Sequence, residues 1–235
     1  MNILAFAAHP DDVEEMCFGT LMKYHAQGDQ IYIVLSTSGN IGSNWHDSRE
    51  ELAAIREKEQ LEAAKPLDAK VKFLRFDDEG LQDTAETRKA FLNAIRWANP
   101  DVIFTHSPKD TSTDHAMTSK LITEVLLVVG GKLVPTEEPP ITKVPSVFFW
   151  DIPAGFKFDP QIFVDITDVM EEKIAAIGCH KSQMAWMEHF MKDDYLETMR
   201  AQSRFRGFQW GCKYAEAFEA YQIQGFVADY RLIPR

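Results

Sequence analysis

The order of apolar runs and helical patterns predicts an α/β fold, built on a mainly parallel sheet with helices on both faces. Short continuous apolar runs of strand length alternate with longer segments whose apolar residues recur at helical spacing. This βαβα order favours parallel strands joined by helical crossovers. Several of the runs also end in polar residues. In such sheets ligands bind beyond the carboxyl ends of the strands, where we expect the active site.

The first strand is expected at Ile3–Ala8, a continuous apolar run. The next segment reads as a helix ending at Gly28, because its apolar residues fall at helical spacing; they are Val13, Met16, Cys17, Leu21 and Tyr24. A second strand follows at Ile31–Leu35. Residues 47–65 are rich in Ala, Leu, Glu, Lys and Arg, offer Asp47 as a cap and stop before Pro66, so they predict a helix.

The remaining elements continue this alternation. Strands are expected at 71–76, 102–105, 146–150 and 162–165, and helices at 84–98, 114–129, 168–187 and 193–206. Residues 130–145 contain four prolines and two adjacent glutamates, which indicates a Pro-rich loop. The whole chain, 1–235, is expected to form one domain. About residues 190–235 would be an extension that completes the pocket or an oligomer contact.

Composition excludes several classes of protein. The 235 residues are 45% hydrophobic and 26% charged, as in ordinary globular domains. Thirty-six acidic residues against 25 basic ones give a net charge of -11, which disfavours nucleic acid and anionic membranes as partners. No apolar run approaches the ~20 residues that cross a bilayer, and the first residues lack the pattern of a signal peptide. Three cysteines in no disulfide or zinc spacing favour a cytoplasmic protein.

Two groups of potential metal ligands follow predicted strands. His9-Pro10-Asp11-Asp12 comes directly after the first strand, and His106 follows the fourth, before Asp114-His115 at a helix start. Taken singly, an Asp-Asp pair is commonly a helix cap and a lone histidine a surface residue. Together at one sheet edge they can form a His-Asp-His site with a position open for water, as in catalytic zinc centres.

Motifs in the same order along most of the chain resemble the PIG-L, or LmbE-like, family of zinc-dependent N-deacetylases. The specific one is Ala8–Glu14, which reads AHPDDVE, followed by Gly19-Thr20-Leu21. Weaker matches lie at 37–42, 55–59, 73–81, 164–167, 180–183 and 214–218.

The resemblance implies a Rossmann-like α/β domain with zinc, or another divalent ion, held by His9, Asp12 and His115. It also implies that Asp11 is the general base. Zinc lowers the pKa of a bound water from 15.7 toward about 7, and Asp11 would take its proton and return it to the leaving amine. The implied substrate is a small-molecule amide, an N-acetylglucosamine-type sugar or sugar conjugate. Relatives often form trimers or hexamers, so a homo-oligomer is expected by analogy.

One position departs from the family pattern. Family members commonly carry a histidine where this chain has Ser112, and that histidine, paired with the Asp at position 114 here, stabilises the tetrahedral intermediate. Serine supplies no positive charge. The candidates to donate instead are His106 and Tyr195, whose alternative readings are a surface histidine and a core aromatic. The departure affects rate and substrate more than metal binding.

Four residues are candidates for substrate contacts. Arg56 would hold sugar hydroxyls or a carboxylate, unless it is a solvated helix residue paired with its neighbours. Asp78 would bind a sugar hydroxyl, or belongs to an acidic turn. Asn44 and Trp45 follow a loop beside the predicted site, where Trp45 would stack on a sugar or lie in an oligomer contact.

Two alternative functions remain open at this stage. One keeps the zinc but acts on another amide, such as a thiol-sugar conjugate or a modified antibiotic. The other is a receiver-like magnesium-binding signalling module, since Asp11-Asp12 and Asp77-Asp78 both follow strands. That module needs a Lys after the fifth strand and leaves His9 and His115 without a role. A nucleotide-binding domain is disfavoured because no GxGxxG follows the first strand.

Overall fold

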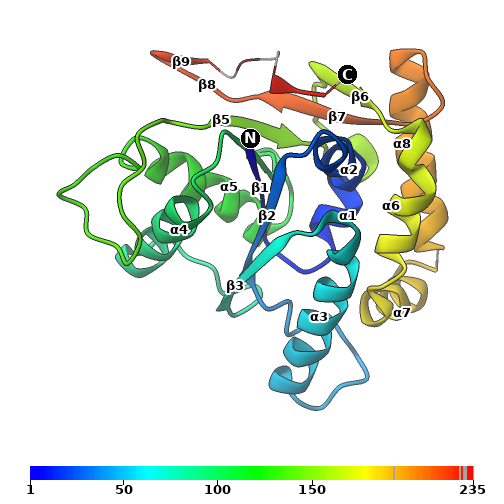
Figure 1. The fold of residues 1–235 in the computed structure, drawn as a ribbon. Helices are drawn as coiled ribbons and strands as arrows, with labels where there is room; N and C mark the ends of the chain where they lie inside the picture. Colours follow the sequence, from blue (N-terminus) through cyan, green and yellow to red (C-terminus); the bar gives the residue numbers. More distant parts are fainter. Residues whose placement is uncertain (193, 228, 230–231, 235) are drawn as a thin grey trace.

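The computed structural model describes residues 1–192, 194–227, 229 and 232–234. Its centre is a seven-stranded sheet in the order β3-β2-β1-β4-β5-β7-β6 (Figure 1). The strands are β1 (Asn2–Ala7), β2 (Gln30–Thr37), β3 (Lys70–Phe76), β4 (Val102–Thr105), β5 (Ser146–Trp150), β6 (Ile162–Asp165) and β7 (Ala215–Ala220). β1 to β5 pair in parallel, and β7 runs antiparallel between β5 and β6. The predicted α/β class is confirmed.

Helices cover both faces of the sheet (Figure 1). They are α1 (Asp12–Met16), α2 (Phe18–Ala26), α3 (Arg49–Ala63), α4 (Ala85–Ala98), α5 (Thr113–Leu126), α6 (Met170–Ile177), α7 (Lys181–Met191) and α8 (Tyr195–Trp210). Short 3-10 turns lie at Lys65–Leu67, Pro153–Gly155 and Thr167–Val169, and β8 (Gln222–Ile223) pairs with β9 (Phe226–Val227). Among the described residues, none of these helices has both the length and the apolarity needed to cross a bilayer.

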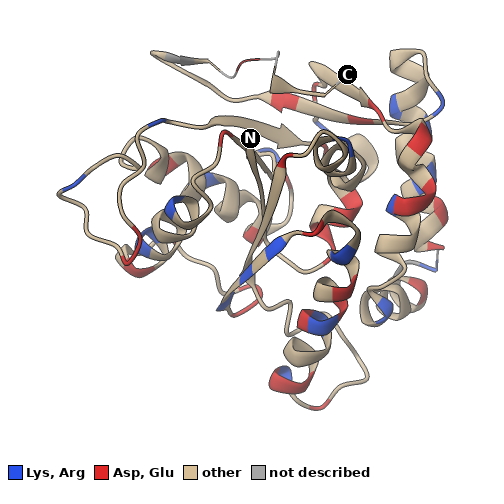
Figure 2. Ribbon diagram, in the orientation of Figure 1, with Lys and Arg blue, Asp and Glu red and all other residues tan. Residues whose placement is uncertain are grey.

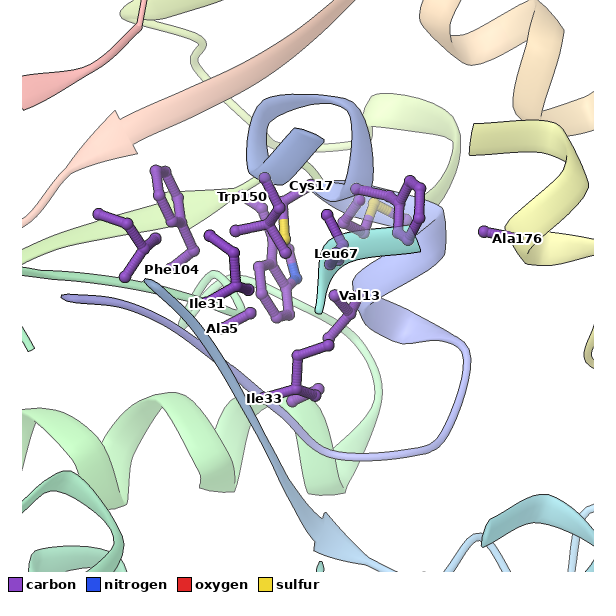
Figure 3. Close-up of a cluster of buried hydrophobic side chains, with 14 of the residues drawn as sticks. Ala5, Val13, Cys17, Ile31, Ile33, Leu67, Phe104, Trp150 and Ala176 are labelled. Carbon is purple, nitrogen blue, oxygen red and sulfur yellow. The ribbon is translucent and has the colours of Figure 1, made fainter. Parts of the chain in front are cut away.

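Alternate residues of β1 supply two separate cores. Ile3, Ala5 and Ala7 pack with apolar residues of α1, α2, α6 and α8. Leu4 and Phe6 pack on the other face with α4 and α5. Figure 3 shows the first core, where strand residues such as Ala5 and Ile33 lie with Val13 and Trp150. This period of two is the strand geometry that buries both faces of a parallel sheet.

The strand register brings the carboxyl ends of the central strands to one edge. Ala7 pairs with Leu35, and Phe6 with Thr105. The Thr105 hydroxyl donates to the carbonyl of Phe6 at 2.8 Å, and the Thr37 hydroxyl to that of Ala8 at 2.9 Å. The loops that carry the candidate ligands therefore leave the sheet side by side.

Two predicted helices are each broken in the structure. The first breaks at Cys17 (φ -142°, ψ 7°) into α1 and α2, because the Glu216 carboxylate accepts from the backbone N–H groups of Gly19 and Thr20 and caps α2. The prediction for 168–187 merges α6 and α7. They separate at residues 178–180, where the fully buried His180 faces Glu14 at 3.2 Å.

Part of the C-terminal segment, strand β7, belongs to the central sheet and is not a peripheral extension. β7 is fully buried and lies inside the sheet, where it pairs with both β5 and β6. α8 runs four residues past its predicted end, to Trp210, and stops at Gly211, whose φ of 91° favours glycine. Asp193, where that helix was expected to begin, and residues 228, 230–231 and 235 of the extension lie outside the described residues.

Candidate metal centre and its cavity

Three side chains from two strand ends converge on one point. His9 and Asp12 come from the turn after β1, and His115 from the first turn of α5. His9 Nδ1 lies 3.1 Å from His115 Nε2, and the Asp12 carboxylate oxygens lie 3.2 Å from His115 Nε2 and 3.7 Å from His9 Nδ1. A tetrahedral zinc site with bonds of about 2.0–2.1 Å separates its ligand atoms by about 3.3–3.4 Å. The donor set therefore fits a divalent ion with one open position.

The second nitrogen of each histidine faces a carboxylate. His9 Nε2 lies 3.1 Å from Asp78 Oδ1 and 3.4 Å from Asp114 Oδ2, while His115 Nδ1 lies 2.9 Å from Asp110 Oδ2. Metal-binding histidines are commonly oriented in this way by a carboxylate behind them. Asp78, expected as a sugar ligand, thus contacts His9. Asp110 was not predicted from the sequence; its signal is a carboxylate five residues before the candidate ligand His115.

Mutual electrostatics hold the cluster together in the absence of metal. Burial lowers the pKa of His9, but the carboxylates of Asp114 and Asp78 outweigh this and raise it to about 9. Burial raises the pKa of Asp12, yet His115 and His106 hold it well below its usual range. In the metal-free protein, positive charge on the histidines therefore balances the negative charge of the surrounding carboxylates. A bound divalent ion would balance the same carboxylates in place of these protons.

Asp11 occupies a strained position beside the cluster. Its φ is 112°, a conformation that non-glycine residues rarely adopt. The Arg56 guanidinium holds this turn: Nη2 donates to the Asp11 carboxylate at 3.1 Å and to the carbonyl of Pro10. Burial raises the pKa of Asp11 to about 6, against the lowering influence of Arg56. A carboxyl with that pKa is suited to act as a base near neutral pH.

Arg56 contacts the protein and not open solvent. It is 3% exposed, and its Nη1 donates to the carbonyl of Gly39 at 3.0 Å. A Cβ atom at Gly39 would lie 2.4 Å from that nitrogen, so glycine is required for the contact. Arg56 also lines the cavity, but its guanidinium donates to Gly39, Pro10 and Asp11, and this geometry supports a role in holding Asp11.

His106 lies behind the metal cluster. It is 1% exposed, its Nδ1 accepts from the Trp150 indole at 3.2 Å, and its Nε2 lies 3.2 Å from Asp12. Burial lowers its pKa to about 4. Because it does not line the cavity, it is placed to orient Asp12 and not to reach a substrate.

A cavity of about 380 Å³ opens beside these residues. The described residues that line it are His9, Asp11, Asp12, Glu15, Ile41, Gly42, Arg56, Asp78, Glu79, His115, Pro153, Gln183, Trp186, Met187 and Tyr195. The size lies within the usual range for small-molecule sites. Tyr195, at the start of α8, lines the cavity. This position is what its proposed role in place of the missing histidine requires.

The expected aromatic contact comes from a different tryptophan. Trp45 is 51% exposed and lies against His189, and neither it nor Asn44, also exposed, lines the cavity. Trp186 of α7 lines it instead, with Gln183 one turn earlier. Glu15 also lines the cavity and was not among the candidates from the sequence.

The position of the missing motif histidine stays without a positive charge. Ser112 lies at the cap of α5, and its backbone N–H donates to Asp110 at 3.0 Å. Asp114 is fully buried, and one of its oxygens accepts from the Glu79 backbone at 2.7 Å. Its Oδ1 has no hydrogen-bond partner among the described residues.

The family of the chain follows from a comparison with known proteins. Residues 4–126, just over half of the chain, match PIG-L, described as GlcNAc-PI de-N-acetylase. The chain belongs to the PIG-L family. The match runs from β1 to the end of α5 and includes all three metal-ligand candidates. The predictions of this family and of an enzyme are confirmed, and β5 is followed by Asp151, where a receiver-like module needs Lys.

Relatives catalyse more than one reaction. The diacetylchitobiose deacetylase of Thermococcus kodakarensis is 29% identical over 226 residues, covering 92% of this chain and 81% of the relative. The 4-oxalmesaconate hydratase of Pseudomonas putida is 25% identical over 200 residues, covering 81% of this chain and 77% of the hydratase. The structure of N,N'-diacetylchitobiose deacetylase from Pyrococcus horikoshii, complexed with its inhibitor MPG, has a TM-score of 0.82 at 28% identity, covering 93% of this chain and 83% of that one.

Proposed function

We propose that this protein is a zinc-dependent deacetylase that hydrolyses the acetamide of an N-acetylglucosamine-type sugar or sugar conjugate. The observation that carries the proposal is the convergence of His9, Asp12 and His115, with Asp11 on the wall of the same cavity. The diacetylchitobiose deacetylases among its relatives support the substrate class.

Asp11 is the group that moves the proton. A divalent ion held by the three ligands would supply a Lewis acid that polarises the acetamide carbonyl and acidifies a water. With a pKa of about 6, Asp11 is ionised at neutral pH and accepts a proton from the attacking water. It then gives that proton to the departing nitrogen, so that acetate and a free amine are released.

Tyr195 takes the part of the missing histidine in this proposal. Its ring lines the cavity and is 5% exposed. Burial raises the pKa of its hydroxyl well above the usual value, so the group stays protonated and donates a hydrogen bond to the developing oxyanion. Asp114, paired with His9, keeps the ligand ring in place.

Metal content and acetate release test the function together. Purified protein should hold about one divalent ion per chain and release acetate from N,N'-diacetylchitobiose or N-acetylglucosamine. Replacing His9 or His115 by Ala should remove the metal, whereas Asp11→Asn should keep the metal and abolish turnover. Metal content that is unchanged in both histidine variants would contradict the site. Loading with zinc, manganese or cobalt after chelation identifies the ion that supports turnover.

A second amide substrate class is favoured by one observation. Ser112 removes a charged donor that the family pattern provides, so the oxyanion is stabilised differently from that in family members with the histidine, and the preferred amide can differ as well. Amine release from a panel of thiol-sugar conjugates and acylated antibiotics, compared with N-acetylglucosamine, separates the two substrate classes.

The oligomeric state and the cytoplasmic location stay predictions. Helix α8 carries exposed aromatic side chains: Phe205, Phe208 and Trp210. Such a surface favours the expected oligomer contact, and light scattering of the purified protein measures its mass directly.

A further inference from the structure

Among the residues that the structure describes, the cavity beside the metal cluster offers no free cationic side chain to a substrate carboxylate or phosphate. Among the described lining residues the permanent cation is Arg56, whose guanidinium already donates to Gly39, Pro10 and Asp11. The two lining histidines belong to the metal cluster. The acidic residues on the same walls are Asp11, Asp12, Glu15, Asp78 and Glu79.

Acidity at this site is local, because charges elsewhere on the chain are mixed. Figure 2 shows acidic and basic segments interleaved along α3, and the basic residues Lys70 and Lys72 lie on β3. The lysine that opens α7 does not reach the cavity either. α7 directs Gln183, Trp186 and Met187 into it, whereas Lys181 and Glu188 line a separate groove.

Two acidic lining residues remain available to a ligand: Glu79, which is exposed, and Glu15, which is half-buried on α1. Asp11 is bonded to Arg56, and Asp12 and Asp78 contact the cluster histidines. The Glu15 carboxyl lines the cavity from α1 and makes no hydrogen bond or ion pair with any residue that the structure describes. Burial and the nearby carboxylates of Asp11 and Asp12 raise its pKa to about 8, consistent with a negative environment that lacks a cationic partner.

Aromatic side chains complete the same cavity. Trp186 of α7 and Tyr195 of α8 line it, and the Trp186 ring is stacked on Phe190 at 5.1 Å, which fixes its orientation. Flat aromatic rings provide an apolar face for a sugar ring, and a neighbouring carboxylate accepts hydrogen bonds from its hydroxyl or amino groups.

We propose that Glu15 determines substrate charge: the cavity accepts N-acetylhexosamines whose neighbouring unit is neutral or carries an ammonium, and rejects those whose neighbouring unit carries a carboxylate. This inference rests on the proposed deacetylase function and narrows its substrate class. At neutral pH Glu15 is largely protonated in the empty cavity. A bound ammonium favours its ionised form and makes a charge-assisted hydrogen bond to it. A bound carboxylate would lie among the other acidic lining residues without a cationic partner. A polycarboxylate of the kind that a hydratase of 4-oxalmesaconate acts on lacks a cationic partner among the protein side chains here.

Three matched disaccharides test the proposal. Each has the same scissile N-acetylglucosamine, and the neighbouring unit is glucosamine, glucose or glucuronic acid. The kcat/KM for acetate release by the metal-loaded enzyme should fall in that order, by about tenfold per step, as expected for one charge-assisted contact. Glu15→Gln should compress the order to within about threefold, and Glu15→Asp should retain it. Glu137→Gln, the same substitution at an exposed loop residue, is the matched control and should retain the full order.

Binding separates this inference from the proposed function. Calorimetric affinities of the three disaccharides for the Asp11→Asn variant should follow the same order without turnover. Equal affinities and equal kcat/KM values for the three, or an order that Glu15→Gln leaves unchanged, would overturn the role of Glu15. If the wild-type protein releases no acetate from any of them while the binding order holds, the deacetylase function fails and the charge selection stands.

Discussion

The Arg56 guanidinium and the Asp11 carboxylate form a buried pair at 3.1 Å, and the same Arg56 nitrogen also holds the carbonyl of Pro10. One planar group thus fixes both the side chain of the proposed base and the strained turn that presents it. The Asp11 backbone N–H donates to Gln60, one helical turn after Arg56 on α3. Gln60 in turn donates to Glu14 at 2.8 Å. The face of α3 is therefore built to position Asp11.

Replacing Arg56 by Lys should reduce kcat far more than it raises KM. An ammonium cannot bond to the Gly39, Pro10 and Asp11 oxygens in the planar geometry of a guanidinium, so the turn loosens. Misplacement of a catalytic group by about 1 Å can lower the rate about 10²-fold. Arg75→Lys, at an exposed pair with Glu57, is the matched control and should retain activity. A raised KM with unchanged kcat would instead assign Arg56 to substrate binding.

Activity should fall as the pH drops through the titration of Asp11. Its pKa lies near 6, above the ordinary value, and the base is competent only when ionised. The kcat/KM of the metal-loaded enzyme should therefore decline tenfold per pH unit on the acid side. Weakening the guanidinium contact in Arg56→Lys removes a lowering influence, so the acid limb should move to higher pH. An acid limb that stays in place would separate Asp11 from the observed titration.

Metal binding should release protons at neutral pH. Asp78 and Asp114 raise the pKa of His9 to about 9, and Asp12 and Asp110 raise that of His115 well above its usual value, in both cases against burial. His9 Nδ1 faces His115 Nε2 at 3.1 Å, so one of these two nitrogens accepts the proton of the other in the metal-free protein. About one proton should therefore leave per ion at pH 7, and apparent affinity should rise with pH. Calorimetry in buffers of different ionisation enthalpy counts these protons, and a count of zero would contradict the assigned charge state.

The sequence predicted that the candidate ligands converge but not which residues form the far wall of the cavity. His9, Asp12 and His115 could be placed because each follows a parallel strand, and strand ends meet at one edge whatever the details of packing. Trp186 could not, because the break at residues 178–180 sets which face of α7 meets the site, and that break depends on the buried His180–Glu14 contact. Trp45 was chosen from the sequence because it lies in a loop close to the predicted site, but it is exposed and does not line the cavity.

Strand β7 shows a second limit of the sequence pattern. It reads AEAFEA, and its glutamates suggest a solvated segment. Both are buried because they have partners: Glu216 accepts from Lys173 at 2.7 Å, and Glu219 from Lys109 at 2.8 Å. Those partners lie far away in the sequence, so composition alone could not identify an interior strand. The fold class survived this omission because β1 to β5 define the parallel unit without it.

Asp110→Asn should weaken metal binding without removing a ligand. The carboxylate accepts from His115 Nδ1 at 2.9 Å and so fixes the ring whose other nitrogen faces the metal site. Loss of such an orienting carboxylate commonly lowers metal affinity 10–100-fold, roughly the range expected here. Competition with a fluorescent chelator measures the affinity, and Asp78→Asn should give a similar loss through His9. Asp159→Asn, outside the cluster, provides the comparison, and equal affinities in all three would contradict the orienting role.

The buried pair between Lys173 and Glu216 should dominate the stability of the C-terminal half. Their side chains are both 2% exposed, and Glu216 also accepts from the N–H groups that begin α2. Lys173→Met leaves the Glu216 charge buried without its cation, which should lower the free energy of unfolding by about 3–5 kcal/mol. Urea denaturation of the metal-free protein measures this, so that metal loss does not contribute. Glu171→Gln, on the same helix α6 as Lys173, breaks a surface ion pair with Arg200 of α8 and should shift the midpoint little. A Lys173→Met midpoint equal to that of Glu171→Gln would show that the capping hydrogen bonds alone hold β7 against α2.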